Sequence, residues 1–324
     1  MSPYFRWRSI LDKINGDKLM KLIYLSLMLI LCNNAIGSIG VSSHYAYSAR
    51  SFSLSDALVA DTYHTFQSFS NPSTLNQCKK INIGSSYFHM SLDRSIQTIY
   101  FSKNLPGNAG LSIAILRESV NDFMGKDSFN NPTNNISMSD YYGLLSFGLK
   151  SFGISIKMHY SSLNINETHS DRFSGNSIVV DLGWSKNLTD KFRLGVKLEN
   201  ILNPYLNWDV DIADGFSHSY TEEYPLIISL GSGYKMSKEH YFLFQQDISS
   251  FNDDLVYSSR FGYEYMPTEN LFIRCGLKGN DDLRLGFGYI YSLKDNLPII
   301  LDYSIDLGSQ KEGISHLLTW SLGL

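Results

Sequence analysis

Apolar and polar residues alternate with a period of two from about residue 81 to the end of the chain. In the stretch 192–199, Phe, Leu, Val and Leu alternate with Arg, Gly, Lys and Glu. The stretches 154–160, 283–291 and 299–307 have the same pattern. A period of two is typical of a β-strand with two different faces, whereas an amphipathic helix repeats every 3.6 residues. The pattern therefore predicts an all-β fold for this part of the chain.

The alternating stretches recur often enough to build a barrel. Each is about 10 residues long, which is the length of a tilted strand that crosses a bilayer, and bacterial single-chain barrels have an even number of strands. The candidates lie near 81–89, 93–103, 109–118, 140–150, 152–163, 177–189, 192–201, 224–235, 239–248, 256–265, 270–278, 282–292, 297–307 and 314–323. The sequence thus predicts a transmembrane antiparallel β-barrel of about 14 strands over residues 81–324.

The connections between the predicted strands alternate in length. Tight turns are expected at 150–152 and 189–191. The longer, polar connections are 119–139, 164–176, 202–223 and 249–255. Short turns at one rim and long loops at the other are typical of outer-membrane barrels. A soluble β-sandwich is the alternative, and the Gly- and Ser-rich polar faces and the apolar last strand favour the barrel.

Charged residues indicate which face of each strand points inward. An Arg or Lys that faces lipid at the middle of the bilayer costs about 2–4 kcal/mol, so we expect the charged face to line the lumen. We expect Arg193, Lys197 and Glu199 to brace the interior and not to select a substrate, because the lumenal charges are of both signs. The predicted lumenal charges are Lys157, Asp181, Arg193, Lys197, Glu199, Arg260, Glu264, Arg274, Lys278, Arg284, Asp302 and Asp306.

The N-terminal region predicts export. Its apolar stretch 22–31 follows Lys18 and Lys21 and precedes the small residues of 35–38, which is the order of a secretory signal peptide. About 20 apolar residues are needed for a spanning helix, so this stretch is too short to be one. We predict a signal peptide over residues 1–37, with Met20 as a candidate native start. A closed barrel is the spanning architecture that remains, which predicts the outer membrane of a Gram-negative bacterium.

Residues 38–80 lack alternation and carry a motif. The runs 49–60 and 69–75 include Arg50, Asn71, Pro72 and Leu75. This motif resembles the signature of the PorV/PorQ family of outer-membrane proteins, which are related in fold to the FadL-type fatty-acid transporters. Leu54-Ser55-Asp56 stands where the family has Met-Gly-Gly, and the resemblance continues along the barrel. It implies a fourteen-stranded barrel with residues 38–80 folded inside as a plug.

Composition and motifs argue against several other functions. Charged residues are 18% of the chain, aromatic residues are 14%, and the net charge of −4 gives no general attraction to nucleic acid. No nucleophile, nucleotide-binding or metal-ligand motif is present. We therefore expect no enzyme activity, no cofactor and no metal. We also expect no disulfide between Cys78 and Cys275, because Cys275 shares the apolar face of its strand.

Three functions remain after these exclusions. The PorV/PorQ resemblance implies a role in protein export or cargo anchoring at the cell surface, of the type IX secretion kind, with 119–139 and 202–223 contacting secretion-machinery subunits or cargo proteins. Tyr205, Trp208 and Phe216 are the candidate partner-binding aromatic residues. The alternative is a FadL-like transporter that passes hydrophobic small molecules across the outer membrane. The third is a purely structural barrel, since fold alone does not decide function.

Overall fold

A computed structural model describes most of the chain. The described residues are 46–62, 66–77, 81–126, 129–165, 172–202, 204–211, 217–251, 254–279, 282–293, 297–307 and 313–323. The predicted signal peptide lies outside them. None of the helices in these parts of the chain has the length and apolar character that crossing a bilayer requires.

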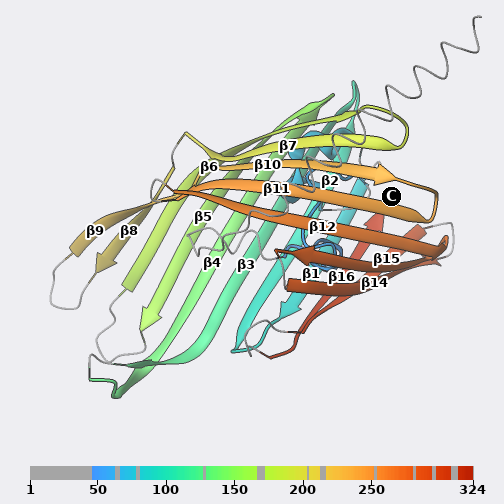
Figure 1. The fold of residues 1–324 in the computed structure, drawn as a ribbon. Coiled ribbons are helices and arrows are strands. Elements are labelled where there is room, and N and C mark those ends of the chain that lie inside the picture. The colour runs from blue at the N-terminus through green and yellow to red at the C-terminus, as the bar shows by residue number, and fades with distance from the viewer. Residues whose placement is uncertain are drawn as a thin grey trace, which may run out of the picture.

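The described residues contain sixteen strand segments, which follow one another along the chain (Figure 1). They are β1 (Ile81–His89), β2 (Arg94–Leu105), β3 (Ala109–Lys126), β4 (Pro132–Leu149), β5 (Phe152–Ile165), β6 (Arg172–Asn187), β7 (Phe192–Ile201), β8 (Tyr205–Asp211), β9 (Ser217–Glu223), β10 (Ile227–Lys235), β11 (His240–Phe251), β12 (Asp254–Thr268), β13 (Leu271–Lys278), β14 (Asp282–Leu293), β15 (Leu297–Asp306) and β16 (Ser315–Gly323).

These segments form one closed antiparallel barrel. Neighbours in sequence pair with one another, and β16 pairs with β1, which closes the ring. The hairpin β8–β9 is an exception, because β8 pairs with the start of β6 while β7 pairs with its end, and β10 pairs with β7. The ring therefore has 14 strands, which confirms the predicted fold class.

Several predicted loops are strands. β3 and β4 extend well into 119–139, β8 and β9 occupy most of 202–223, and β11 and β12 extend into 249–255. The alternation fades there because a strand that rises above the lipid no longer needs an apolar outer face. Its backbone hydrogen bonds to the neighbouring strands persist, so the segment is still a β-strand. Period two thus identifies the membrane-crossing part of each strand and underestimates its length.

The two rims of the barrel differ. At the rim where β1 begins and β16 ends, the strands are joined by short turns, and we name it the short-turn rim. The long hairpins β3–β4 and β8–β9 rise from the opposite rim, which we name the hairpin rim (Figure 1). In outer-membrane barrels short turns face the periplasm and long loops face the outside of the cell, so the hairpin rim is the extracellular one.

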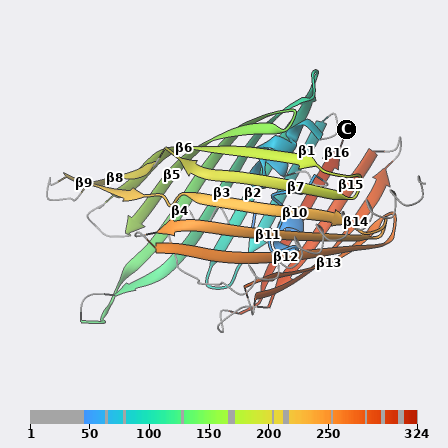
Figure 2. The same cartoon turned by 45° about the horizontal axis from the view of Figure 1, so that its top comes forward.

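The segment before β1 lies inside the ring of strands (Figure 2). Its described residues, 46–62 and 66–77, are named the lumenal segment. They form α2 (Ala49–Ser53), α3 (Gln67–Ser70) and the 3₁₀ helix η2 (Pro72–Gln77). Ser48 caps α2 by accepting a hydrogen bond from the backbone N–H of Ser51, and the Ser51 hydroxyl accepts a hydrogen bond from the backbone N–H of Ser48. These two hydrogen bonds satisfy backbone N–H groups at the start of α2 that have no partner within the helix.

The turn after α2 uses left-handed backbone without glycine. Ser55 and Asp56 have φ angles of 51° and 59°, at the positions where the resembled family has glycines. A left-handed residue with a Cβ atom costs roughly 1–2 kcal/mol. The tight turn is thus retained although both glycines are absent.

Replacing Ser55 by glycine should stabilise the protein. We expect the Ser55→Gly variant to gain about 1 kcal/mol in free energy of unfolding, because glycine adopts positive φ without strain. The urea midpoint of unfolding in lipid vesicles measures this. Ser53→Gly is the matched control, since Ser53 is helical and glycine there should lower the midpoint. A lower midpoint for Ser55→Gly would contradict the expectation.

Candidate functional site

The lumenal segment packs directly on the backbone of the barrel wall. Pro72 and Leu75 lie over four glycines that are register partners on adjacent strands. A Cβ atom added at any of these glycines would lie closer than 3.0 Å to an atom of the segment. We name this set the glycine row: Gly110, Gly148, Gly153 and Gly183 of β3 to β6. Only glycine allows so close an approach of two backbones.

Asn71 links the segment to the wall beside the glycine row. Its side-chain amide donates to the carbonyl oxygen of Val59 at 2.7 Å and to that of Trp184 in β6 at 3.1 Å. Its Oδ1 atom accepts hydrogen bonds from the backbone and hydroxyl of Ser73 at 3.1 and 2.7 Å. Asn71 is fully buried, so each of these bonds satisfies a group that cannot reach water. The predicted motif residues Asn71, Pro72 and Leu75 thus lie together against one side of the wall.

Arg50, the fourth predicted motif residue, lies on the other side of the segment. Its Nη1 atom is 2.5 Å from Asp61 of the segment, and its Nε atom is 2.9 Å from Glu264 of β12. Burial by itself lowers the pKa of Arg50, but the charges of Asp61 and Glu264 outweigh burial and raise it well above its usual value. Arg50 therefore stays charged and ties the segment to the barrel.

The ion pairs continue around the barrel interior from Glu264. Arg274 of β13 contacts Glu264 at 2.6 Å and Asp302 of β15 at 2.6 Å. Two further ion pairs are formed by Arg260 of β12. Its guanidinium contacts Asp56 of the lumenal segment at 3.1 Å and Asp247 of β11 at 2.7 Å. These guanidinium groups are buried and engaged by carboxylates, which is the arrangement that makes buried charge tolerable.

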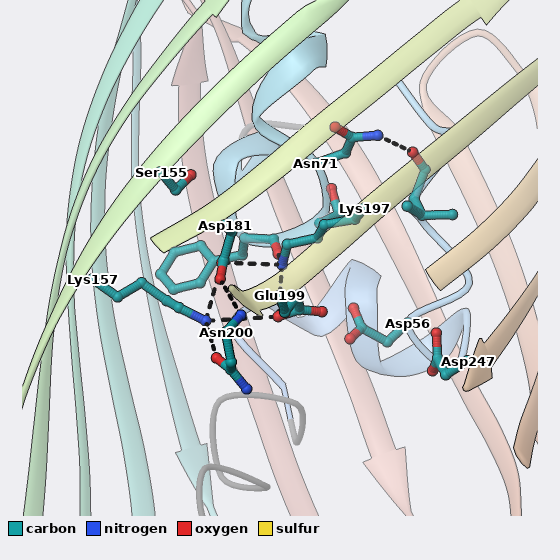
Figure 3. A network of polar contacts seen from close by, with 12 residues as sticks. Asp56, Asn71, Ser155, Lys157, Asp181, Lys197, Glu199, Asn200 and Asp247 are labelled. Carbon is teal, nitrogen blue, oxygen red and sulfur yellow. Dashed lines mark hydrogen bonds and ion pairs between the residues drawn. The ribbon is translucent and has the colours of Figure 1, made fainter. Parts of the chain in front are cut away.

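A second network lies beside the lumenal segment on β5 to β7 (Figure 3). Lys157 is 3.0 Å from Asp181, and Lys197 is 3.0 Å from Glu199. Lys197 also donates to the carbonyl oxygen of Phe69 in the segment at 2.7 Å. The network therefore connects three wall strands with the segment.

Two more of the predicted lumenal charges, Arg193 and Arg284, also point inward. Arg193 donates to Gln77 of the segment at 2.7 Å and to Ser185 at 3.1 Å. Arg284 pairs with Asp282 at 2.7 Å, and its guanidinium lies over the ring of Phe52 in α2, 4.3 Å from the ring centre. Most of these basic groups thus contact the lumenal segment itself.

A cavity of about 520 Å³ lies inside the barrel toward the short-turn rim. The lumenal segment contributes Arg50 and Phe66, and the barrel contributes Phe272 and Arg274. Ile290 and Ile300 add aliphatic surface from β14 and β15. This volume falls within the range of small-molecule sites, which are largely apolar with a few fixed polar groups.

The pairing along β6 is interrupted on one side. Leu182 pairs with Leu198, but Val180 pairs with Ile201, and the next pair joins Asn176 to Asn207 of β8. Between the first two of these pairs β7 has one residue more than β6, which forms a β-bulge. Beyond Ile201 the chain no longer pairs with β6 until β8 begins. We name this place the wall interruption.

Asn200 holds the wall interruption in place. Its φ angle is 59°, and its backbone N–H donates to Oδ1 of Asp181 at 3.1 Å. Its side chain accepts a hydrogen bond from Lys157 at 3.3 Å (Figure 3). The same side chain donates to the carbonyl oxygen of Pro225 at 2.7 Å. Sequence analysis missed this residue. Its sequence signal was the combination of an asparagine at a strand end with Pro204 shortly after it.

The predicted partner-binding aromatic residues differ in exposure. Tyr205 is 48% exposed, whereas Trp208 is only 7% exposed. The Trp208 ring stacks on Tyr220, and its indole N–H donates to Glu222 at 3.2 Å. Trp208 is therefore engaged within the β8–β9 hairpin, which does not favour it as an anchor for a partner. Phe216 lies outside the described residues.

Metal and thiol chemistry find little support in the described parts of the chain. No group of three or more His, Cys, Asp or Glu there could hold a metal ion. Cys275 is a free, half-buried cysteine of β13. Cys78 lies outside the described residues.

Comparison with known proteins places the fold. No protein-family model matches the chain, and no curated protein matches it in sequence. The toluene transporter TodX of Pseudomonas putida superposes with a TM-score of 0.62 at 13% identity, over 87% of this chain and 99% of that one. The CymD monoaromatic hydrocarbon channel has a TM-score of 0.57 at 12% identity, over 86% and 97%. A Pseudomonas aeruginosa FadL homologue has a TM-score of 0.51 at 12% identity, over 86% and 96%. The barrel described above thus has the fold of FadL-type channels.

Proposed function

We propose that this protein is an outer-membrane channel for hydrophobic small molecules in a Gram-negative bacterium. The observation that carries the proposal is the cavity between the lumenal segment and the wall, because its surface is mainly apolar and its size suits a small molecule. The structural neighbours support it, since TodX and CymD are described as a toluene transporter and a monoaromatic hydrocarbon channel.

The charges of the lumen favour this function over an ion channel. Arg50 and Arg274 border the cavity, and both are bound by carboxylates. An ion would have to replace these partners, whereas an uncharged apolar molecule needs only the apolar surface. The lumenal segment lies inside the ring of strands, so passage requires the segment to move.

An uptake experiment tests the proposal. Ile300 points into the cavity, so Ile300→Trp should fill it and lower the uptake of a monoaromatic hydrocarbon about tenfold in cells that depend on this barrel. Leu301→Trp is the matched control, because Leu301 faces outward on the same strand and is exposed. Equal uptake by the wild type, by Ile300→Trp and by cells that lack the barrel would contradict the proposal.

The PorV/PorQ resemblance implies the other candidate, protein export. It rests on the motif residues around Arg50 and Asn71 and on the exposed Tyr205, whereas two of the structural neighbours are described as a toluene transporter and a monoaromatic hydrocarbon channel. A crosslinked pull-down from purified outer membranes separates the two. Recovery of secretion-machinery subunits would favour export, and recovery of the barrel alone would favour the channel.

A further inference from the structure

On the outer surface of β2 to β6, the side chains change from apolar to polar within two residues along each strand. Register partners on β2 to β6 form an apolar row: Ile99, Ile115, Gly143, Met158 and Ile178. Two residues further toward the hairpin rim lies an amide and tyrosine row: Gln97, Arg117, Tyr141, Tyr160, Asn176 and Asn207. Two residues beyond that lies a serine row, of which Ser119 is buried and bonded to Ser95: Ser95, Ser119, Ser139, Ser162 and Ser174. These rows mark the outer boundary of the hydrocarbon.

A pocket opens on the outer surface at this boundary. It has a volume of about 590 Å³ and lies where the wall interruption separates β6 from the start of β8. Met158 and Ile178 of the apolar row border it and are 62% and 65% exposed. Asn176 and Asn207 of the amide and tyrosine row border its polar end. The pocket therefore joins an apolar part at lipid level to a pair of amides at headgroup level.

The inner end of the pocket is closed by buried polar groups. His159 and Ser177 line it there, and both are buried. His159 bonds to Tyr224, lies 3.1 Å from Asp140 and stacks on the ring of Tyr142. These contacts hold the His159 ring in place and so close the pocket toward the lumen. The pocket is therefore open toward the membrane.

Next to the pocket, the apolar row is hollowed at Gly143. A Cβ atom added there would meet no atom within 4 Å. Gly143 is the register partner of Met158. This leaves a shallow depression for an alkyl chain beside the pocket.

We propose that this pocket binds one acyl chain of an outer-leaflet glycolipid, whose saccharide headgroup lies on the amide and tyrosine row and the serine row. The two rows contain amides, hydroxyls and phenols, which can both donate to and accept from sugar hydroxyls. They contain few charges, and Arg117 stacks on Tyr141 at 5.6 Å from the ring centre. Phosphatidylethanolamine has no sugar hydroxyls for these amides, hydroxyls and phenols to bind, whereas a phosphate of the glycolipid can pair with Arg117. A bound glycolipid would cover the wall interruption from outside.

Lipid retention measured by native mass spectrometry tests the proposal. Barrel refolded in detergent is incubated with lipopolysaccharide that consists of lipid A and the inner sugar core, or with phosphatidylethanolamine, and then exchanged into fresh detergent. We expect one lipopolysaccharide per barrel to be retained, at least about tenfold more than phospholipid. Asn176→Leu together with Asn207→Leu should lower lipopolysaccharide retention about tenfold by removing two hydrogen-bonding groups.

Two tryptophan variants separate the pocket from the general lipid surface. Met158→Trp should fill the pocket and abolish retention, whereas Ile154→Trp, on the outer face of the same strand and nearer the short-turn rim, should leave it unchanged. The heat-modifiable gel mobility of folded barrels verifies that each variant folds, and Asn207→Leu alone replaces the double variant if that one does not. Equal retention of both lipids, or equal loss in Ile154→Trp, would overturn the proposal. Hydrocarbon uptake is measured separately, so this outcome is independent of the proposed channel.

Discussion

Replacing Gly153 by alanine should displace the lumenal segment. A Cβ atom at Gly153 would lie closer than 3.0 Å to backbone atoms of Pro72 and Ser73, and backbone cannot turn aside as a flexible side chain can. Overpacking of this kind costs about 1–3 kcal/mol, and the clash here is with the element that fills the lumen. We expect the variant barrel to fold and to conduct ions across a planar bilayer at least about tenfold more than the wild type.

Gly143→Ala is the matched control for this experiment. Gly143 lies on β4, beside β5, but faces outward, and an added Cβ atom there meets nothing within 4 Å. Its conductance should equal that of the wild type. A second measurement is limited proteolysis from the periplasmic side, which should cleave the segment sooner in Gly153→Ala. Wild-type conductance together with wild-type proteolysis in Gly153→Ala would show that the segment does not depend on the glycine row.

Glu264→Gln should destabilise the protein strongly. Glu264 is buried and pairs with Arg50 of the lumenal segment and Arg274 of β13 at 2.9 and 2.6 Å. Removing one partner of a buried ion pair typically costs about 3–5 kcal/mol, because the remaining charge has no compensation. We expect the urea midpoint of unfolding in lipid vesicles to fall by a corresponding amount, and the segment to become accessible to protease.

Two further variants identify the cause. Glu239→Gln is the control, since Glu239 lies in an exposed turn and should leave the midpoint unchanged. Replacing the whole network, Arg50, Asp61, Glu264, Arg274 and Asp302, by apolar residues of similar size should recover much of the loss, because no carboxylate or guanidinium of the network is then left buried without a partner. A midpoint for Glu264→Gln equal to that of Glu239→Gln would exclude the ion pairs as supports of the segment.

The strands could be predicted because lipid imposes a strict rule on each position. A strand such as 192–201 must present apolar residues outward and can place charges only inward, so its period is visible in the sequence. The extensions of β3 and β4 were missed because no lipid constrains the outer face above the membrane. The hairpin β8–β9 was missed for the same reason, and because its inner aromatic residues pack on one another.

The sequence by itself determined the all-β barrel and the inward side of strands such as β7, on which Arg193, Lys197 and Glu199 are buried. Only the tertiary structure decided which charges meet, because Arg50 and Glu264 are 214 residues apart and become neighbours only when the lumenal segment lies inside the ring. The wall interruption at Asn200 also required the structure. A register shift is a relation between two strands, and the pattern of one strand alone contains no information about it.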